Sequence, residues 1–152
     1  MKIVKLAEKH LEDLAEIDLH SHAPWTKDSF KSELNNGVAR YYVAENDDEK
    51  AIGYVGYWWS FYEIQITFLA VHENARRQGV AKALMQYVYE ECQEMGTETI
   101  QLEVRSGNTS AISLYENLGF KKVGVRPKYY GGTEDALLMD LAVRPKGNEI
   151  NG

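Results

Sequence analysis

The sequence predicts a mixed α/β domain in which helices cover the faces of one sheet. Two apolar periodicities, one typical of strands and one of helices, alternate in the order β, α, α, β, β, β, α, β, α, β, β. The 152 residues suit one ordinary domain, and 44% of them are hydrophobic, enough to bury a sizeable core. No repeat and no linker rich in serine and proline divides the chain. We therefore expect a single domain over residues 1–143 and a flexible tail over residues 144–152.

The first quarter of the chain predicts one strand followed by two helices. Residues 2–6 are a short strand candidate, and within residues 9–20 the apolar side chains recur at helical spacing. Thr26 is suited to cap a second helix that continues through Leu34. The pair Asn36-Gly37 is expected to end this second helix, because glycine readily takes the conformation that follows a helix.

A β-rich stretch follows the two helices. Its three strands are expected at residues 40–45, 51–61 and 63–71. The polar residues between the first two strands predict a hairpin turn. Gly53 and Gly56 lie within the second strand, where glycine suggests a bulge or the close approach of another backbone.

The second half of the chain alternates helices and strands. We expect a helix over residues 80–95, a strand over 99–104, a short helix over 111–118, and strands over 120–126 and 134–142. Gly96 and Gly119 are expected to end the two helices. In sheets of this kind, ligands bind where strand ends meet helix starts, so we expect the functional crevice there.

Composition excludes several classes of protein. Seventeen Lys and Arg against twenty-three Asp and Glu give a net charge of −6, which argues against a general nucleic-acid coat. The lone Cys92 excludes an internal disulfide, and no zinc-ligand spacing is present, so we expect no metal. Charged residues near Met1 break every apolar run there, and no stretch approaches the length of a membrane span, so we expect a soluble, cytoplasmic protein without a signal peptide or membrane span. Four histidines lack ligand spacing and are expected on the surface: His10, His20, His22 and His72.

The stretch after the third strand of the β-rich region is suited to hold a phosphate group. Strand residues 69–71 run into a polar loop and then directly into a helix start. Gly79 and the small Ala81 leave the backbone bare there, so N–H groups and the helix dipole can bind an anion such as a pyrophosphate. Three cations reinforce this site: Arg76, Arg77 and Lys82. From the residues alone, a solvated loop before an ordinary helix remains the alternative, because one glycine is a weak motif.

Two motifs resemble the GCN5-related N-acetyltransferase (GNAT) family. The run Arg76-Arg77-Gln78-Gly79-Val80-Ala81 is similar to the family's Arg/Gln-x-x-Gly-x-Gly/Ala signature, which cradles the pyrophosphate of acetyl-CoA. Ala81 replaces the commoner second glycine. Asn108 and residues 111–120 resemble the second signature, Asn-x-x-Ala-x-x-Leu-Tyr-x-x-x-Gly-Phe. The resemblance implies the GNAT fold, a mixed and mostly antiparallel sheet of six to seven strands flanked by about four helices.

Within this family, the chain resembles the ribosomal-protein-alanine N-acetyltransferases. The segments that carry this resemblance are Pro24-Trp25-Thr26 with Phe30, Leu102-Glu103-Val104-Arg105, Tyr129-Tyr130 and Glu134-Asp135-Ala136. One departure is Phe68, which stands where this subfamily often has Asn. The resemblance extends from Leu6 to Leu141, nearly the whole chain.

The resemblance also implies the binding residues. Acetyl-CoA is the expected co-substrate. Its expected ligands are Leu69, Ala70, Val71, Arg76, Arg77, Gln78, Gly79, Val80, Ala81, Lys82 and Asn108. The residues expected to contact the acceptor are Trp25, Phe68, Tyr129 and Tyr130.

Glu103 and Tyr115 are the catalytic pair that the resemblance implies. Glu103 would remove a proton from the acceptor amine, directly or through a water, and Tyr115 would give a proton to the departing thiolate. The residues alone leave other interpretations open. Glu103 can be a solvated strand residue, Tyr115 a core aromatic and Asn108 a helix cap.

The implied function is the acetylation of a protein N-terminal amine, by direct attack of the amine on the thioester. The expected acceptor is an alanine on a basic ribosomal protein, and a net charge of −6 suits a cationic partner. One alternative is an N-acetyltransferase for small amines such as polyamines or amino acids. Another is a non-catalytic acyl-CoA-binding domain, against which the presence of Glu103 and Tyr115 counts. We expect neither nucleic acid nor membrane as a partner, and the sequence fits both a monomer and a dimer.

Overall fold

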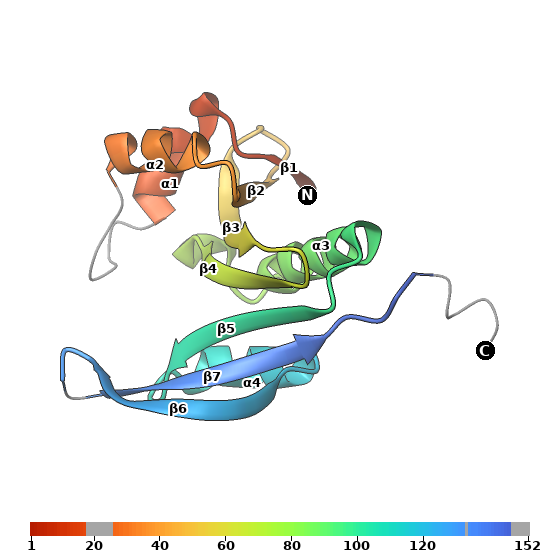
Figure 1. Ribbon diagram of the computed structural model, residues 1–152. Coiled ribbons are helices and arrows are strands. Elements are labelled where there is room, and N and C mark those ends of the chain that lie inside the picture. Colours follow the sequence, from red (N-terminus) through yellow and green to blue (C-terminus); the bar gives the residue numbers. More distant parts are fainter. Residues whose placement is uncertain (18–25, 133, 147–152) are drawn as a thin grey trace. The chain divides into compact units, whose positions relative to one another are not determined.

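The structure, a computed structural model, describes residues 1–17, 26–132 and 134–146. Helices and strands follow one another in the predicted order (Figure 1). The strands are β1 (Lys2–Lys5), β2 (Ala39–Glu45), β3 (Ala51–Trp59), β4 (Glu63–Val71), β5 (Thr99–Arg105), β6 (Lys121–Tyr130) and β7 (Glu134–Ala142). The helices are α1 (Leu11–Ile17), α2 (Lys27–Leu34), α3 (Val80–Met95) and α4 (Thr109–Asn117), with short 3₁₀ turns at Glu8–His10 and Glu73–Ala75.

Within the described residues, the strands are ordered β1-β2-β3-β4-β5-β7-β6 in a seven-stranded sheet. The pairs β1–β2, β2–β3, β5–β7 and β6–β7 are antiparallel, whereas β4 and β5 are parallel. A mixed, mostly antiparallel sheet with four helices confirms the fold class that the sequence predicts.

Most predicted boundaries agree with the structure. Both β4 and β7, and also α3, begin and end at the predicted residues. β3 stops at Trp59, earlier than predicted, because the Ser60 N–H donates to the Glu63 carbonyl at 2.9 Å and closes the hairpin. β6 continues past the predicted end to Tyr130. The helix predicted over residues 9–20 is a 3₁₀ turn followed by α1, and residues 18–20 lie outside the described chain.

Contacts divide the chain into two compact units. The first unit is formed by Met1–Trp59 and Thr67–Val88, and the second by Ser60–Ile66 and Tyr89–Gly152. β4 and α3 therefore contribute residues to both units. The single domain over residues 1–143 stays a prediction, and each unit has its own buried side chains.

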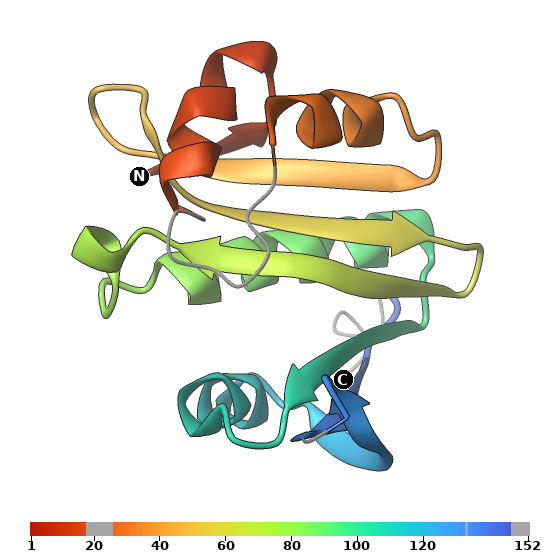
Figure 2. The same cartoon turned by 90° about the vertical axis from the view of Figure 1, so that its left-hand side faces the viewer.

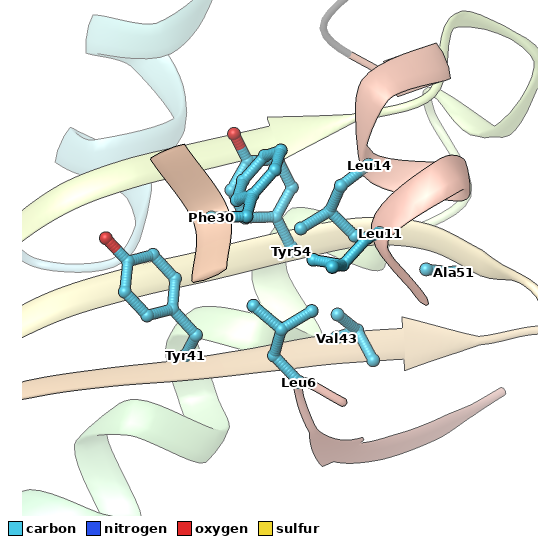
Figure 3. Close-up of a cluster of buried hydrophobic side chains, with 8 residues drawn as sticks. All are labelled: Leu6, Leu11, Leu14, Phe30, Tyr41, Val43, Ala51 and Tyr54. Atoms are coloured by element: carbon cyan, nitrogen blue, oxygen red, sulfur yellow. The ribbon is translucent and has the colours of Figure 1, made fainter. Parts of the chain in front are cut away.

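In the first unit, α1 and α2 cover one face of the strands (Figures 1 and 2). The Thr26 hydroxyl oxygen accepts the Ser29 N–H at 3.1 Å, which confirms the predicted cap of α2. Phe30 of α2 meets Tyr54 of β3 edge to face, with ring centroids 6.1 Å apart. Figure 3 shows the core cluster, which consists of Leu6, Leu11, Leu14, Phe30, Tyr41, Val43, Ala51 and Tyr54. The core of this face is therefore formed by side chains from α1, α2 and the strands together.

The opposite face of these strands packs against the first half of α3. A Cβ on Gly53 would lie 2.8 Å from Val80 Cγ1 of α3 and 3.1 Å from the Ala70 carbonyl oxygen of β4. The register of β2 and β3 also shifts between Ala44 and Glu45, beside Gly53. The bulge and the close backbone approach predicted for this glycine are therefore both confirmed.

The prediction of surface histidines is wrong for His10. Its side chain is 1% exposed, and its Nε2 lies 2.6 Å from the Glu45 carboxylate of β2. The Ala7 N–H donates to Nδ1 at 3.0 Å, so Nε2 carries the ring proton and donates to Glu45. This hydrogen bond, together with the ammonium of Lys9 at 3.3 Å, holds the pKa of Glu45 below its usual range. A buried polar pair thus anchors the first helical turn to the sheet.

In the second unit, β5, β7 and β6 form an antiparallel sheet with α4 behind it (Figure 1). Alternate side chains of β5, at Ile100, Leu102 and Val104, are buried. A Cβ on Gly119, just after α4, would lie 3.2 Å from Leu141, which pairs with Ile100. The helix end therefore lies on the buried side, and alternation turns Glu103 toward the other face.

The last described residues contact α3. The Arg144 N–H donates to the Tyr89 hydroxyl at 3.1 Å, and the Gln93 side-chain amide donates to the Arg144 carbonyl at 3.1 Å. Lys146 and Glu94 form an ion pair. The remainder of the predicted tail, residues 147–152, lies outside the described chain.

Candidate active site

The carboxyl end of β4 carries backbone donors on its outer edge. The His72 N–H donates to the Ile52 carbonyl of β3 at 2.8 Å. Since successive N–H groups of a strand point to opposite sides, the N–H groups of Leu69 and Val71 point away from β3. The ladder between β4 and β5 runs over Glu63–Gln65, so these two donors lie beyond it. This edge of the first unit can therefore pair with an extended ligand that carries amide groups.

Short-range contacts hold the loop that follows β4. His72 Nδ1 accepts the Asn74 N–H at 3.1 Å and caps the 3₁₀ turn, whose last residue is buried. Arg77 has φ of +64°, in the left-handed region, where the chain reverses before α3. The side chains of Arg76, Arg77 and Gln78 are exposed. The loop thus presents its polar side chains to solvent just before the helix begins.

Gly79 starts α3 with a bare backbone. Its φ is +78°, and its carbonyl accepts the Ala83 N–H at 3.0 Å, which makes it the N-cap. No described heavy atom lies within 4 Å of the place where a Cβ would be. The N–H groups of the first turn, including those of Ala81 and Lys82, have no partner within the helix and lie at the positive end of its dipole. The residues present therefore fit a pyrophosphate, as the sequence predicts.

Glu103 lies in the second unit, on the partly exposed face of β5. Its Oε1 is 3.2 Å from Nε of Arg126 on β6, and its side chain is 19% exposed. Within the described chain, no hydrogen bond engages the other carboxylate oxygen. Glu103 thus combines an ion pair at one oxygen with a second oxygen that can accept a proton.

Tyr115 lies on α4 and is 9% exposed. Its ring centroid is 5.7 Å from that of Phe120, and its carbonyl accepts the Phe120 N–H at 3.0 Å. The ring is therefore part of the second unit's core, as its spacing indicates. A packed ring is compatible with a reacting hydroxyl, because packing fixes the direction in which the hydroxyl points.

Asn108 caps α4. Its side-chain oxygen accepts the Ala111 N–H at 3.2 Å, which confirms the helix-cap interpretation. The preceding loop is fixed by Glu134, whose Oε2 accepts the Gly107 N–H at 3.1 Å while Oε1 lies 3.2 Å from Arg105 Nη1. The contact of Asn108 with a cofactor stays a prediction.

Two of the four residues expected at the acceptor have described side chains. Phe68 packs on Tyr54 in the first unit, with ring centroids 6.3 Å apart. Tyr129 in the second unit is exposed, and the Arg126 guanidinium lies 5.8 Å from its ring centroid. Tyr130 is the last residue of β6, and Trp25 lies outside the described residues.

Sequence reasoning missed Arg126 and Glu134 as partners of candidate site residues. Arg126 is an exposed cation near the end of a predicted strand, and nothing in its spacing links it to Glu103. Glu134 lies within a segment that carries the family resemblance, which indicated that the residue matters. The resemblance did not indicate which residues Glu134 contacts. Both partnerships depend on the pairing of β7 with its two neighbours.

Cys92 has the properties of a structural thiol. It is buried on α3, and burial raises the pKa of its thiol to about 12, so it is protonated at neutral pH. Among the residues that the structure describes, no three His, Cys, Asp or Glu side chains are grouped to hold a metal ion. No helix in the described segments is long and apolar enough to cross a membrane.

Known proteins share both the sequence and the fold. The model of the acetyltransferase (GNAT) family matches residues 7–120. A Bacillus subtilis protein, provisionally named a ribosomal protein bS18-alanine N-acetyltransferase, is 39% identical over 136 residues, which cover 88% of this chain and 89% of that protein. The enzyme of that name from Escherichia coli K12 is 32% identical over 131 residues, covering 84% and 87%. The crystal structure of the ribosomal-protein-S18-alanine N-acetyltransferase from Escherichia coli matches with a TM-score of 0.84 and 29% identity, over 97% of this chain and 96% of that one.

Three observations agree on identity. Both signature motifs lie where the family resemblance requires them, at the start of α3 and along α4. The fold matches that of a solved acetyltransferase over 97% of this chain. The family model covers most of the chain. The chain therefore belongs to the GNAT acetyltransferase family and is an N-acetyltransferase that uses acetyl-CoA.

Proposed function

We propose that this enzyme acetylates the N-terminal amine of a protein, an alanine on a basic ribosomal protein, with Glu103 as base and Tyr115 as acid. The observation that carries the proposal is the bare start of α3 at Gly79, which suits the pyrophosphate of an acyl donor. The acceptor is supported by the relatives from Bacillus subtilis and Escherichia coli, which are named for the alanine of ribosomal protein bS18. Each of them aligns with most of the chain.

Residues of the first unit would bind most of acetyl-CoA. The proposed ligands are Leu69, Ala70, Val71, Arg76, Arg77, Gln78, Gly79, Val80, Ala81 and Lys82, with Asn108 of the second unit. The first-turn N–H groups of α3 donate to the pyrophosphate, and the outer edge of β4 pairs with the amide-bearing arm. When bound, acetyl-CoA supplies the acetyl group as a thioester whose sulfur leaves as a thiolate.

Residues of the second unit would move the protons. Glu103 accepts a proton from the acceptor ammonium, directly or through a water, so that the amine nitrogen can attack. Tyr115 donates its hydroxyl proton to the departing sulfur. The Val71 N–H donates a hydrogen bond to the acyl oxygen, where negative charge develops. Cys92 takes no part, because a buried, protonated thiol is a poor acyl carrier.

Several features favour a protein N-terminus as the acceptor. An α-amino group has a pKa of about 8, against about 10.4 for a lysine side chain, so more of it is neutral at pH 7. The net charge of −6 favours the approach of a cationic protein. Phe68, Tyr129, Tyr130 and Trp25 are the proposed acceptor contacts. We expect the reaction to occur in the cytoplasm. The enzyme is expected to act as a monomer or a dimer.

Release of free thiol from acetyl-CoA tests this proposal. The acceptors to compare are peptides with an N-terminal alanine, the same peptides acetylated at the N-terminus, spermidine and free lysine. We expect the highest kcat/KM with the alanine peptides and no release with the blocked ones. Faster turnover of spermidine or lysine than of every N-terminal peptide would identify a small-amine enzyme instead. No release with any acceptor would indicate a domain that binds acyl-CoA without catalysis.

A further inference from the structure

We infer that Arg126 is a positioning residue that orients the Glu103 carboxylate toward the acceptor amine. This inference rests on the proposed function, in which Glu103 is the base. It concerns a residue for which neither motif of the family resemblance gives a role. The residues that carry it, Glu103, Arg126 and Tyr129, all lie in the second unit.

The ion pair between Glu103 and Arg126 spans a whole strand. Glu103 lies on β5 and Arg126 on β6, and β7 runs between them. On β7, Leu138 pairs with Glu103, whereas Ala136 pairs with Arg126. Neighbouring strands lie about 4.8 Å apart, so the two long side chains must bridge roughly 10 Å of backbone separation. On this face of β7, the side chain opposite Arg126 is only the methyl group of Ala136, whereas Leu138 lies opposite Glu103.

The geometry of the contact suits orientation of a base. Arg126 uses Nε for Oε1 of Glu103 at 3.2 Å, and the other carboxylate oxygen has no hydrogen bond to any described residue. A glutamate side chain has three rotatable bonds, and an ion-pair contact at one oxygen favours the side-chain conformations that leave the other oxygen accessible. Arg126 therefore holds the carboxylate without occupying the oxygen that would take the proton.

Arg126 also contacts the acceptor side of the proposed site. Its guanidinium carbon lies 5.8 Å from the centroid of the Tyr129 ring, within the range of a cation–π contact. Tyr129 lies on the same strand, β6, and its side chain is exposed. The same guanidinium thus touches both the proposed base and a proposed acceptor contact, so acceptor binding and base orientation are coupled through it.

A purely structural role fits the pair less well. The Arg126 side chain is 56% exposed, and ion pairs at that exposure contribute little to stability because water screens them. The neighbouring pair, Arg105 with Glu134, fixes the loop at Gly107 through a second hydrogen bond, whereas no such loop contact of Arg126 is found in the described chain. Loss of Arg126 should therefore change the reaction rather than the fold.

The first experiment replaces Arg126 with Gln and with Lys, and measures kcat, KM for an N-terminal-alanine peptide and the melting temperature. We expect Arg126→Gln to lower kcat about 10-fold, less than the roughly 100-fold that a 1 Å misplacement can cost, because Glu103 still visits the productive position. The melting temperature should not change. Arg126→Lys should recover part of kcat, since an ammonium can still bind one carboxylate oxygen. Lys122→Gln is the matched control: it removes an exposed cation from the same strand and should leave kcat unchanged.

The second experiment combines Arg126→Gln with Glu103→Gln. If Arg126 acts through Glu103, its replacement should lower kcat in the parent enzyme and have no further effect in the Glu103→Gln background. Equal losses in both backgrounds would overturn the inference, because Arg126 would then act independently. An unchanged kcat in Arg126→Gln, with Glu103→Gln strongly impaired, would overturn the inference and leave the proposed function intact. Normal turnover in Glu103→Gln itself would overturn both the inference and the assignment of Glu103 as the base.

Discussion

The candidate site in the first unit is built mainly from backbone, whereas that in the second unit is built from side chains. In the first unit, the edge of β4 and the start of α3 offer N–H groups, and Gly79 leaves the space above them open. In the second unit, Glu103 is held by Arg126 and Tyr115 packs on Phe120. A phosphate binds well to a fixed array of N–H groups, but proton transfer needs groups that can gain or lose a proton.

This difference predicts opposite responses to mutation. A backbone site tolerates most side-chain changes and fails where a new Cβ enters the open space. A side-chain site fails when a single functional group is replaced, even if the shape is preserved.

The largest effect is expected from isosteric changes in the second unit. Glu103→Gln and Tyr115→Phe should each lower kcat by roughly 10²–10⁴-fold, the usual contribution of general acid–base catalysis, while the Kd of coenzyme A stays unchanged. Steady-state kinetics and calorimetry measure the two quantities. The Glu103→Gln loss should shrink as pH rises past about 8, because more of the α-amine is then neutral without a base. A near-normal kcat in Glu103→Gln at pH 7 would show that Glu103 is a solvated strand residue without a role in catalysis.

The second largest effect is expected when a side chain is introduced at Gly79 in the first unit. Gly79→Val should raise the Kd of coenzyme A by about 10- to 100-fold, because the branched side chain blocks close approach to the first turn of α3 and strains a positive φ. Gly96→Val is the matched control. It lies at the other end of α3, has φ of +74° and an equally open surrounding, so it carries the same strain. Equal Kd values for these two variants would show that the start of α3 does not hold the cofactor.

A smaller effect is expected at Asn108, where a cap and a proposed cofactor contact coincide. Asn108→Ala should lower the free energy of unfolding by about 1 kcal/mol, the typical cost of losing an N-cap. Asn108→Asp keeps an oxygen for the Ala111 N–H and should keep the stability. If the side-chain amide also donates to acetyl-CoA, Asn108→Asp should still weaken coenzyme A binding. Unchanged binding in this stable variant would leave Asn108 as a cap alone.

The smallest effect is expected from single exposed cations of the first unit. Arg76→Gln or Lys82→Gln should raise the Kd of coenzyme A only about 2- to 4-fold, because water and salt screen exposed charges. The same measurement in 0.5 M salt should reduce the difference further. A loss as large as that of Gly79→Val would contradict a site built mainly from backbone.

Local patterns in the sequence determined much of the fold. The limits of α3 and β4 agree with prediction because apolar periodicity and a terminal glycine are properties of neighbouring residues, and Gly96 does take a positive φ. The Thr26 cap followed for the same reason. The helix start at Gly79 and the family identity were also readable, since both depend on a short continuous motif.

Contacts between distant residues were decided only by the tertiary structure. His10 has the surroundings of a surface residue in the sequence, yet it is buried at the end of the 3₁₀ turn Glu8–His10, where it meets Glu45 of β2. In the same way, Arg126 reaches Glu103 only because β7 lies between their strands in one particular register. A shift of one residue in the pairing of β6 with β7 would turn Arg126 to the other face of the sheet, away from Glu103. Periodicity predicts which face a residue takes, but strand order and register decide which distant residue it meets there.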